Sequence, residues 1–258
     1  MLEKLITKWW FYVIVLLIAF VPSITQKSVP PEQTPLIIQE VLQNPLVYKY
    51  SVFFPVSKIL LIILIAGPLI LKNSFRRLFS IFFVILMSIV AIFQNISLET
   101  QFGYAILLGN IIIQGIVIIT WIYEIKVQKN DFSKINITWW KILCLLLGFF
   151  AFWMPSKNGF MHFSFIDLFI NEAGLTYCMI TPVALSVLLL YYPDVNKVSL
   201  RVTALVGLYF GIMNIFTWFV LNAEFWWMGV LHLPLLINSI IGLVCSRSIK
   251  SMDSYNTE

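Results

Sequence analysis

The sequence predicts an all-α, polytopic membrane protein in which eight transmembrane helices form a 4+4 parallel tandem repeat. The first observation behind this prediction is composition: the 258 residues are 60% hydrophobic and only 11% charged, whereas soluble domains are roughly 25% charged. The second is that continuous apolar runs of membrane-spanning length recur along the chain. The third is that Lys and Arg gather in alternate loops, as expected of a cytoplasmic face.

The apolar runs lack the alternation that transmembrane strands show. Helices are therefore expected, because backbone groups in lipid must find partners within their own segment. The predicted spans are 9–25, 53–71, 78–97, 102–123, 138–154, 175–192, 201–220 and 226–245. The first span has features of a signal peptide, but Ala19-Phe20-Val21 is a poor cleavage site, so we interpret it as a retained helix.

The basic residues predict that both termini are cytoplasmic and that the protein crosses the cell membrane repeatedly. Of the 17 Lys and Arg residues, 13 then fall on the inner side and 4 on the outer side. The outer four are Lys27, Lys49, Lys58 and Lys157. Lys58 lies near the outer end of the second span, so its long side chain is expected to reach the surface.

Two outer loops are expected to contain short interface helices. In the loop 22–52, Thr34 followed by Pro35 is typical of a helix start, and the residues after it form an apolar stripe suited to a membrane surface. The loop 155–174 has a similar pattern with more aromatic residues. We expect it to rest against lipid headgroups or to cover the bundle.

An internal repeat is predicted from residues that recur at an offset of about 127 positions. Residues 1–127 and 128–250 would be two four-helix halves, and 251–258 a cytoplasmic tail. Because four is an even number, both halves would insert the same way round. The matching residues are Glu40 and Asp167, Asn44 and Asn171, Tyr50 and Tyr177, and Pro55 and Pro182.

The repeated polar residues are the main candidates for a binding site. Each half carries a carboxylate and an amide four residues apart, on one face of a helix. They would form a two-part outer site for a polar or cationic group; the alternative is that they are solvated edges of interface helices. The candidate substrate-binding residues are Glu40, Asn44, Asp167, Asn171, Glu172, Glu224 and His232.

Small and uncharged polar residues recur within the last two predicted spans. They include Gly207, Gly211, Asn214, Asn238 and Gly242. We interpret them as residues that let helices approach closely and hydrogen-bond across the interface. The alternative is that they line a path for a polar solute.

Signals for catalysis, metals and cofactors are weak. The sequence contains no nucleophile-elbow, zinc-protease or nucleotide-binding motif. His162 and His232 are isolated, and the three cysteines lie in apolar spans, where they are expected to pack as small hydrophobic residues. We therefore expect no catalytic residue, metal or cofactor, and no nucleic-acid partner; whether the protein is an enzyme stays open, with a non-enzyme favoured.

These observations favour a membrane protein that binds or moves a small or amphipathic molecule at the outer leaflet. It would be a transporter or the membrane subunit of one, and ATP-driven transport would then need a partner ATPase. One alternative is a sensor or self-protection protein that responds to an extracellular agent. Another is an intramembrane enzyme that acts on a lipid-linked substrate, with the outer carboxylates as acid and base.

Overall fold

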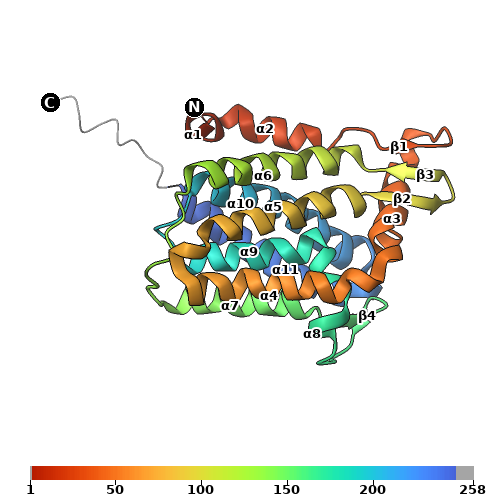
Figure 1. Cartoon of the computed structure of the whole chain (residues 1–258). Coiled ribbons are helices and arrows are strands. Elements are labelled where there is room, and N and C mark those ends of the chain that lie inside the picture. Colours follow the sequence, from red (N-terminus) through yellow and green to blue (C-terminus); the bar gives the residue numbers. More distant parts are fainter. Residues whose placement is uncertain (1, 248–258) are drawn as a thin grey trace.

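The computed structural model describes residues 2–247, and this part of the chain is mostly helical. Long helices lie side by side with their ends at two opposite ends of the molecule (Figure 1). Eight of them overlap the predicted spans: α2 (Trp9–Ile18), α4 (Phe54–Leu71), α5 (Arg76–Phe93), α6 (Leu108–Val127), α7 (Trp139–Trp153), α9 (Tyr177–Leu190), α10 (Lys197–Phe216) and α11 (Trp226–Ser246). A short helix, α1 (Leu2–Ile6), precedes them. The predicted tail 251–258 lies outside the described residues.

By length and composition, four helical stretches in the described part of the chain could cross a membrane. They are Pro31–Phe93, which contains α4 and α5, and Leu108–Val127, Lys197–Leu221 and Ala223–Ser246. A fifth is obtained if Asp167–Leu175 and Tyr177–Leu190, which meet at an angle of 100°, count as one bent span. The apolar helices α2 and α7 are shorter. The structure thus supports a polytopic helical protein, while the count of eight spans stays a prediction.

Helix α9 is the centre of the bundle. Every one of its residues is buried, and α4, α5, α7, α10 and α11 all contact it (Figure 1). Its sequence, YCMITPVALSVLLL, has no charged residue and no polar face. A helix that is apolar on all sides has to lie inside other helices, which explains the position of α9.

Small residues bring α10 and α11 close together, as the packing interpretation predicts. A Cβ atom at Gly207 would lie closer than 3.0 Å to Ser239 Oγ, and one at Gly242 would lie 2.9 Å from Ala204 Cβ. At Gly211 the nearest atom would be the Cα of Leu236, at 3.1 Å. The two helices can pack at this separation only because these positions carry no side chain.

Amide side chains connect the helices. The Asn238 Nδ2 group donates to the carbonyl oxygens of Cys144 in α7 and Pro182 in α9, each at 3.2 Å. The Asn214 Nδ2 group in α10 donates to the Cys178 sulfur in α9 at 3.6 Å, and it also donates to the Phe210 carbonyl within its own helix at 2.8 Å. Helix packing is therefore confirmed as a role of these residues.

One end of the bundle is held by a buried polar network. The Glu124 carboxylate, at the end of α6, accepts from the backbone N–H of Asn130 at 2.8 Å and from the side chain of Asn196. Arg76, at the start of α5, donates to Gln128 at 3.1 Å. Three of the loops that were predicted to share the inner side therefore meet at this end.

The opposite end carries β-structure that the span prediction missed. A three-stranded antiparallel sheet has the order β1-β3-β2, formed by Ile24–Thr25, Gly103–Ile106 and Ile96–Thr100. The predicted spans 9–25, 78–97 and 102–123 therefore extended too far, because α2, α5 and α6 end or begin short of the sheet. Gly103 has a φ of +81°, which allows the tight turn between β2 and β3.

The two interface helices differ in length. The first, α3, spans Thr34–Gln43, within one residue of its predicted position, and packs on the sheet. Its buried residues Ile37 and Val41 form a separate cluster with Phe102, Ala105 and Leu107. The second, α8, is only one turn long, Asp167–Ile170, and it follows a short hairpin made of β4 (Ser156–Lys157) and β5 (Phe160–Met161).

Candidate functional site

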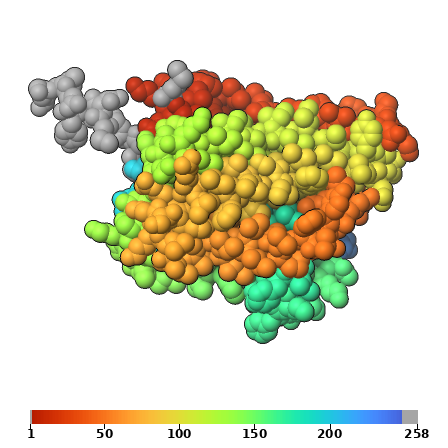
Figure 2. Space-filling view, in the orientation of Figure 1, coloured from red at the N-terminus to blue at the C-terminus, as the bar shows by residue number. Residues whose placement is uncertain are grey.

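A pocket of about 390 Å³ lies at the end of the molecule that carries the sheet, between α4, α5 and the 3₁₀ segment Leu46–Phe53. Figure 2 shows a hollow between the orange and yellow-orange parts of the surface, with teal atoms at its base. Ten residues line the pocket: Val47, Tyr50, Phe53, Val56, Ser57, Leu60, Leu86, Ile89, Phe93 and Leu175.

The lining of the pocket is almost entirely hydrocarbon. Only Tyr50 and Ser57 carry polar side-chain groups, and the Ser57 hydroxyl already donates to the Phe54 carbonyl at 2.7 Å. A charged or strongly polar group would lose its hydration there without gaining partners. The pocket therefore suits an apolar chain or ring, and its volume lies in the usual range for small-molecule sites.

The floor of the pocket is part of a segment that we call the strap, Asp167–Leu175. It contains α8, Asn171 and the 3₁₀ turn Glu172–Leu175, and it bends by 100° into α9. Leu175 is buried and lines the pocket. Gly174 lies so close to Ser57 in α4 that a Cβ there would come within 2.9 Å of the Ser57 backbone carbon, so only glycine fits this contact.

Sequence reasoning misjudged Lys58, the residue that follows the pocket-lining Ser57 in α4. Its side chain is fully buried instead of reaching the surface. The ammonium donates to the Phe152 carbonyl at the end of α7 and lies 4.5 Å from the centre of the Phe152 ring. The signal in the sequence was a lysine inside an otherwise apolar helix.

Three predicted site residues lie together in the strap. Asn171 is buried, and its Nδ2 group donates to the carbonyl oxygens of Trp153 and Met154 at 2.7 and 3.2 Å. Asp167 is largely buried, with its carboxylate 3.6 Å from the ring of His162. Glu172 is half-buried at the start of the 3₁₀ turn. Asn171 therefore fixes the strap to the end of α7.

The matching pair in the first half has different surroundings. Glu40 accepts a hydrogen bond from the backbone N–H of Gln101 at 3.0 Å, which ties α3 to the β2–β3 turn. Asn44 is exposed, and its backbone caps the end of α3. Figure 1 shows α3 beside the sheet and α8 next to α4. The two carboxylate–amide pairs therefore make different contacts, and no contact between them is observed among the described residues.

The last two candidates also lie apart from the strap. Glu224 is exposed in the short turn Ala223–Phe225. His232 is buried in α11, where its Nδ1 atom lies 2.6 Å from the carbonyl oxygen of Met228 in the same helix. Within residues 2–247, no group of three or more His, Cys, Asp or Glu side chains is arranged to hold a metal ion.

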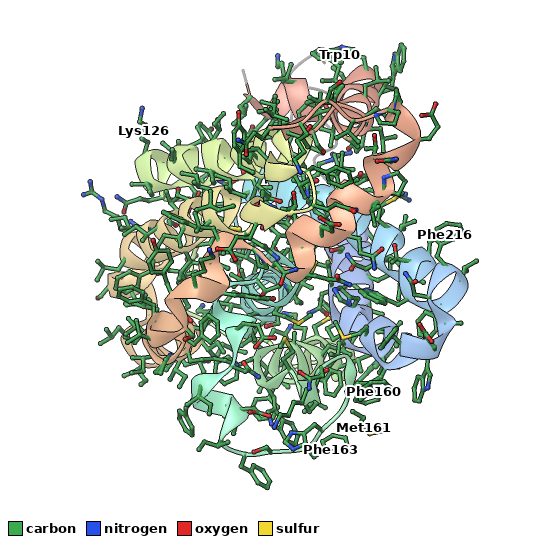
Figure 3. The ribbon with its side chains drawn as sticks, turned by 90° about the vertical axis from the view of Figure 1, so that its right-hand side faces the viewer. Trp10, Lys126, Phe160, Met161, Phe163 and Phe216 are labelled. Atoms are coloured by element: carbon green, nitrogen blue, oxygen red, sulfur yellow. The ribbon has the colours of Figure 1, made fainter. Side chains whose placement is uncertain are left out.

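An apolar surface projects from the hairpin that precedes the strap. Phe160, Met161 and Phe163 point outward together in Figure 3, and Phe165 is 79% exposed. This surface is held firmly, because Phe165 stacks on Trp153 with ring centres 5.6 Å apart and planes only 11° from parallel. The position fits the expectation that the loop rests against lipid.

Comparison of the chain with protein-family models, with curated proteins and with solved structures finds no match.

Proposed function

We propose that this protein binds the apolar part of an amphipathic molecule in the pocket between α4 and α5, at the outer leaflet of a cell membrane. The observation that carries the proposal is the pocket: it is lined by hydrocarbon and lies at the end of the molecule where α4 begins and α5 ends. In the eight-span arrangement with cytoplasmic termini, this end is the outer one.

The exposed side chains support that arrangement. Apolar residues point outward from the middle of the helices, for example Ile62 in α4 and Ile119 in α6. Exposed tryptophans, Trp9 and Trp139, begin α2 and α7 at one end, and Trp226 begins α11 at the other. Aromatic residues at both ends of an apolar surface are typical of the two membrane interfaces. The tandem repeat of 1–127 and 128–250 stays a prediction from the sequence.

The size of the pocket defines the ligand class. A water molecule occupies about 30 Å³ in the liquid, and a methylene group occupies slightly less. The pocket volume of 390 Å³ would therefore hold on the order of a dozen chain carbons. A single acyl chain of this length fits, with its polar head at the surface. The lack of any carboxylate, histidine, cysteine, lysine or arginine among the ten lining residues favours binding or transfer of such a molecule over catalysis in the pocket.

The proposal is tested by filling the pocket. Leu60 lines it, whereas the neighbouring Ile59 is 53% exposed, so Leu60→Trp and Ile59→Trp form a matched pair. The probe is a lysophosphatidylcholine with a 12-carbon chain that ends in a photoactivatable diazirine, added to the purified protein in nanodiscs. We expect cross-links to peptides of α4 and α5 in the wild type and in Ile59→Trp, and their loss in Leu60→Trp. Equal labelling of both variants, or a wild type labelled only elsewhere, would refute the proposal.

A further inference from the structure

The pocket has a buried end and an exposed edge. Leu86 and Leu175 lie at the buried end, with 1% and 4% of their surfaces exposed. Tyr50 and Phe53, from the 3₁₀ segment Leu46–Phe53, form the edge and are 47% and 55% exposed. An apolar chain gains most by filling the buried end, because the free energy gained grows with the apolar area removed from water. The polar head of the same molecule is then left beside Tyr50 and Phe53.

An ion pair lies next to this exposed edge. Lys49 directly precedes Tyr50 in the chain, and its ammonium donates to the carboxylate of Glu99 in β2. Strand β2 follows α5, whose last residue, Phe93, lines the pocket. The pair therefore joins the segment Leu46–Phe53 to the strand that continues from α5, at the end of the pocket where the head would lie.

Both charges of the pair are accessible to a ligand. The side chains of Lys49 and Glu99 are 45% and 77% exposed. Two other charged groups at the same sheet are instead held by the backbone of Gln101: Lys27 donates to its carbonyl at 2.9 Å, and Glu40 accepts from its N–H at 3.0 Å. An exposed ion pair contributes little to stability, so Lys49 and Glu99 can exchange partners with a ligand at little cost.

We propose that Lys49 and Glu99 recognise the head group of the amphipathic molecule, and that this head is zwitterionic, with an anionic phosphate next to a cationic amine. The inference rests on the proposed function, because it names the class of molecule that the same pocket binds. The Lys49 ammonium pairs with the phosphate and the Glu99 carboxylate with the amine, so that positive and negative charges alternate. A head with only a negative charge gains one attraction and meets one repulsion.

The preference for one head group over another tests the proposal. Two probes with the same 12-carbon diazirine chain are added in equal amounts to the purified protein in nanodiscs: a zwitterionic lysophosphatidylcholine and an anionic lysophosphatidylglycerol. Mass spectrometry separates the two adducts on peptides of α4 and α5. The measured quantity is the ratio of zwitterionic to anionic adduct in each variant, divided by the same ratio in the wild type, so that the partitioning of the probes into the lipid cancels.

The two members of the pair should change this ratio in opposite directions. Glu99→Gln removes the charge that repels the anionic head, so the ratio should fall about two- to fivefold, the size expected of one exposed charge interaction. Lys49→Gln leaves Glu99 to repel the anionic head, so the ratio should rise by a similar factor. Glu224→Gln and Lys157→Gln remove exposed charges elsewhere at this end of the molecule and should leave the ratio unchanged.

The remaining outcomes count against the proposal. A ratio that stays constant, that moves in the same direction in Lys49→Gln and Glu99→Gln, or that changes equally in the controls would overturn it. If the pair only holds the segment Leu46–Phe53 in place, both variants will lower the cross-linking of the two probes alike, which would also overturn it. A wild type in which neither probe labels α4 or α5 refutes the proposed function and this inference with it, whereas labelling of the pocket with an unchanged ratio refutes the head-group assignment alone.

Discussion

Adding one methyl group at Gly207 should destabilise the bundle, although the same change elsewhere stabilises it. Alanine has a higher helix propensity than glycine by about 0.5–1 kcal/mol. At Gly207, however, the new Cβ would lie closer than 3.0 Å to Ser239 Oγ and 3.4 Å from Thr181 Cγ2. Forcing an extra carbon into a packed core typically costs about 1–3 kcal/mol. The net expectation is a loss of about 1–2 kcal/mol.

Gly115 provides the matched control. It lies within α6, and a Cβ there would meet no other atom within 4 Å. Gly115→Ala should therefore gain about 0.5–1 kcal/mol through helix propensity alone. The assay is reversible unfolding in mixed micelles of increasing SDS content, followed by circular dichroism. A Gly207→Ala variant as stable as Gly115→Ala would refute the packing argument.

A second substitution identifies the clashing atom. Ser239 Oγ is buried and has no hydrogen-bond partner among the described residues, so removing it alone should have little effect. Ser239→Ala in the Gly207→Ala background should recover most of the lost stability. If the double variant is no more stable than Gly207→Ala, the clash lies elsewhere and the account of the α10–α11 contact is wrong.

Three further predictions concern stability and topology. Asn238→Leu removes the amide that bridges α7 and α9 and should cost about 0.6–1.7 kcal/mol in the same unfolding assay; an unchanged midpoint would count against the bridge. A cysteine at Lys157 should react with an impermeant maleimide added outside cells, and one at Lys129 should not; outside labelling at Lys129 would overturn the eight-span arrangement. Hydrogen bonds from Ser133 and then Asn73 lower the pKa of Asp131 from its ordinary 3.8. The stability that the ionised Asp131 contributes is present above pH 3.8 and is lost as the pH falls through the lower folded-state pKa. Asp131→Asn should therefore make the free energy of unfolding less dependent on pH on the acid side. An unchanged pH dependence would contradict the assignment.

Much of the architecture follows from local pattern. Runs of apolar residues identified the position of each long helix, because burial in lipid or protein is what such runs require. The helix start was found because proline favours the first turn of a helix, but the expected N-cap was wrong: Gln33 holds that position and Thr34 is already helical. The strands between α5 and α6 were missed because Ile96–Thr100 is short and borders a long apolar helix, so the pattern of the helix dominated the window.

The candidate site was less accessible from the sequence. Asp167, Asn171 and Glu172 were identified as unusual polar residues beside an apolar span, and they do lie together in the strap. Lys58 was misjudged because its burial depends on α7, which lies far away in the sequence. The pocket could not be predicted, because it has no sequence motif. Its lining is made of ordinary apolar residues, such as Val47, Leu60 and Leu86, which come together only when four segments of the chain pack against one another.

The most direct test of the central claim is a density map of the purified protein in lipid nanodiscs, at a resolution that shows side chains. We expect an elongated density between α4 and α5, with its apolar end at Leu175 and its head near Tyr50 and Phe53 at the surface. The same map for Leu60→Trp should show the indole in that space and no chain. A wild-type map in which the pocket is closed by the protein's own side chains would contradict the account.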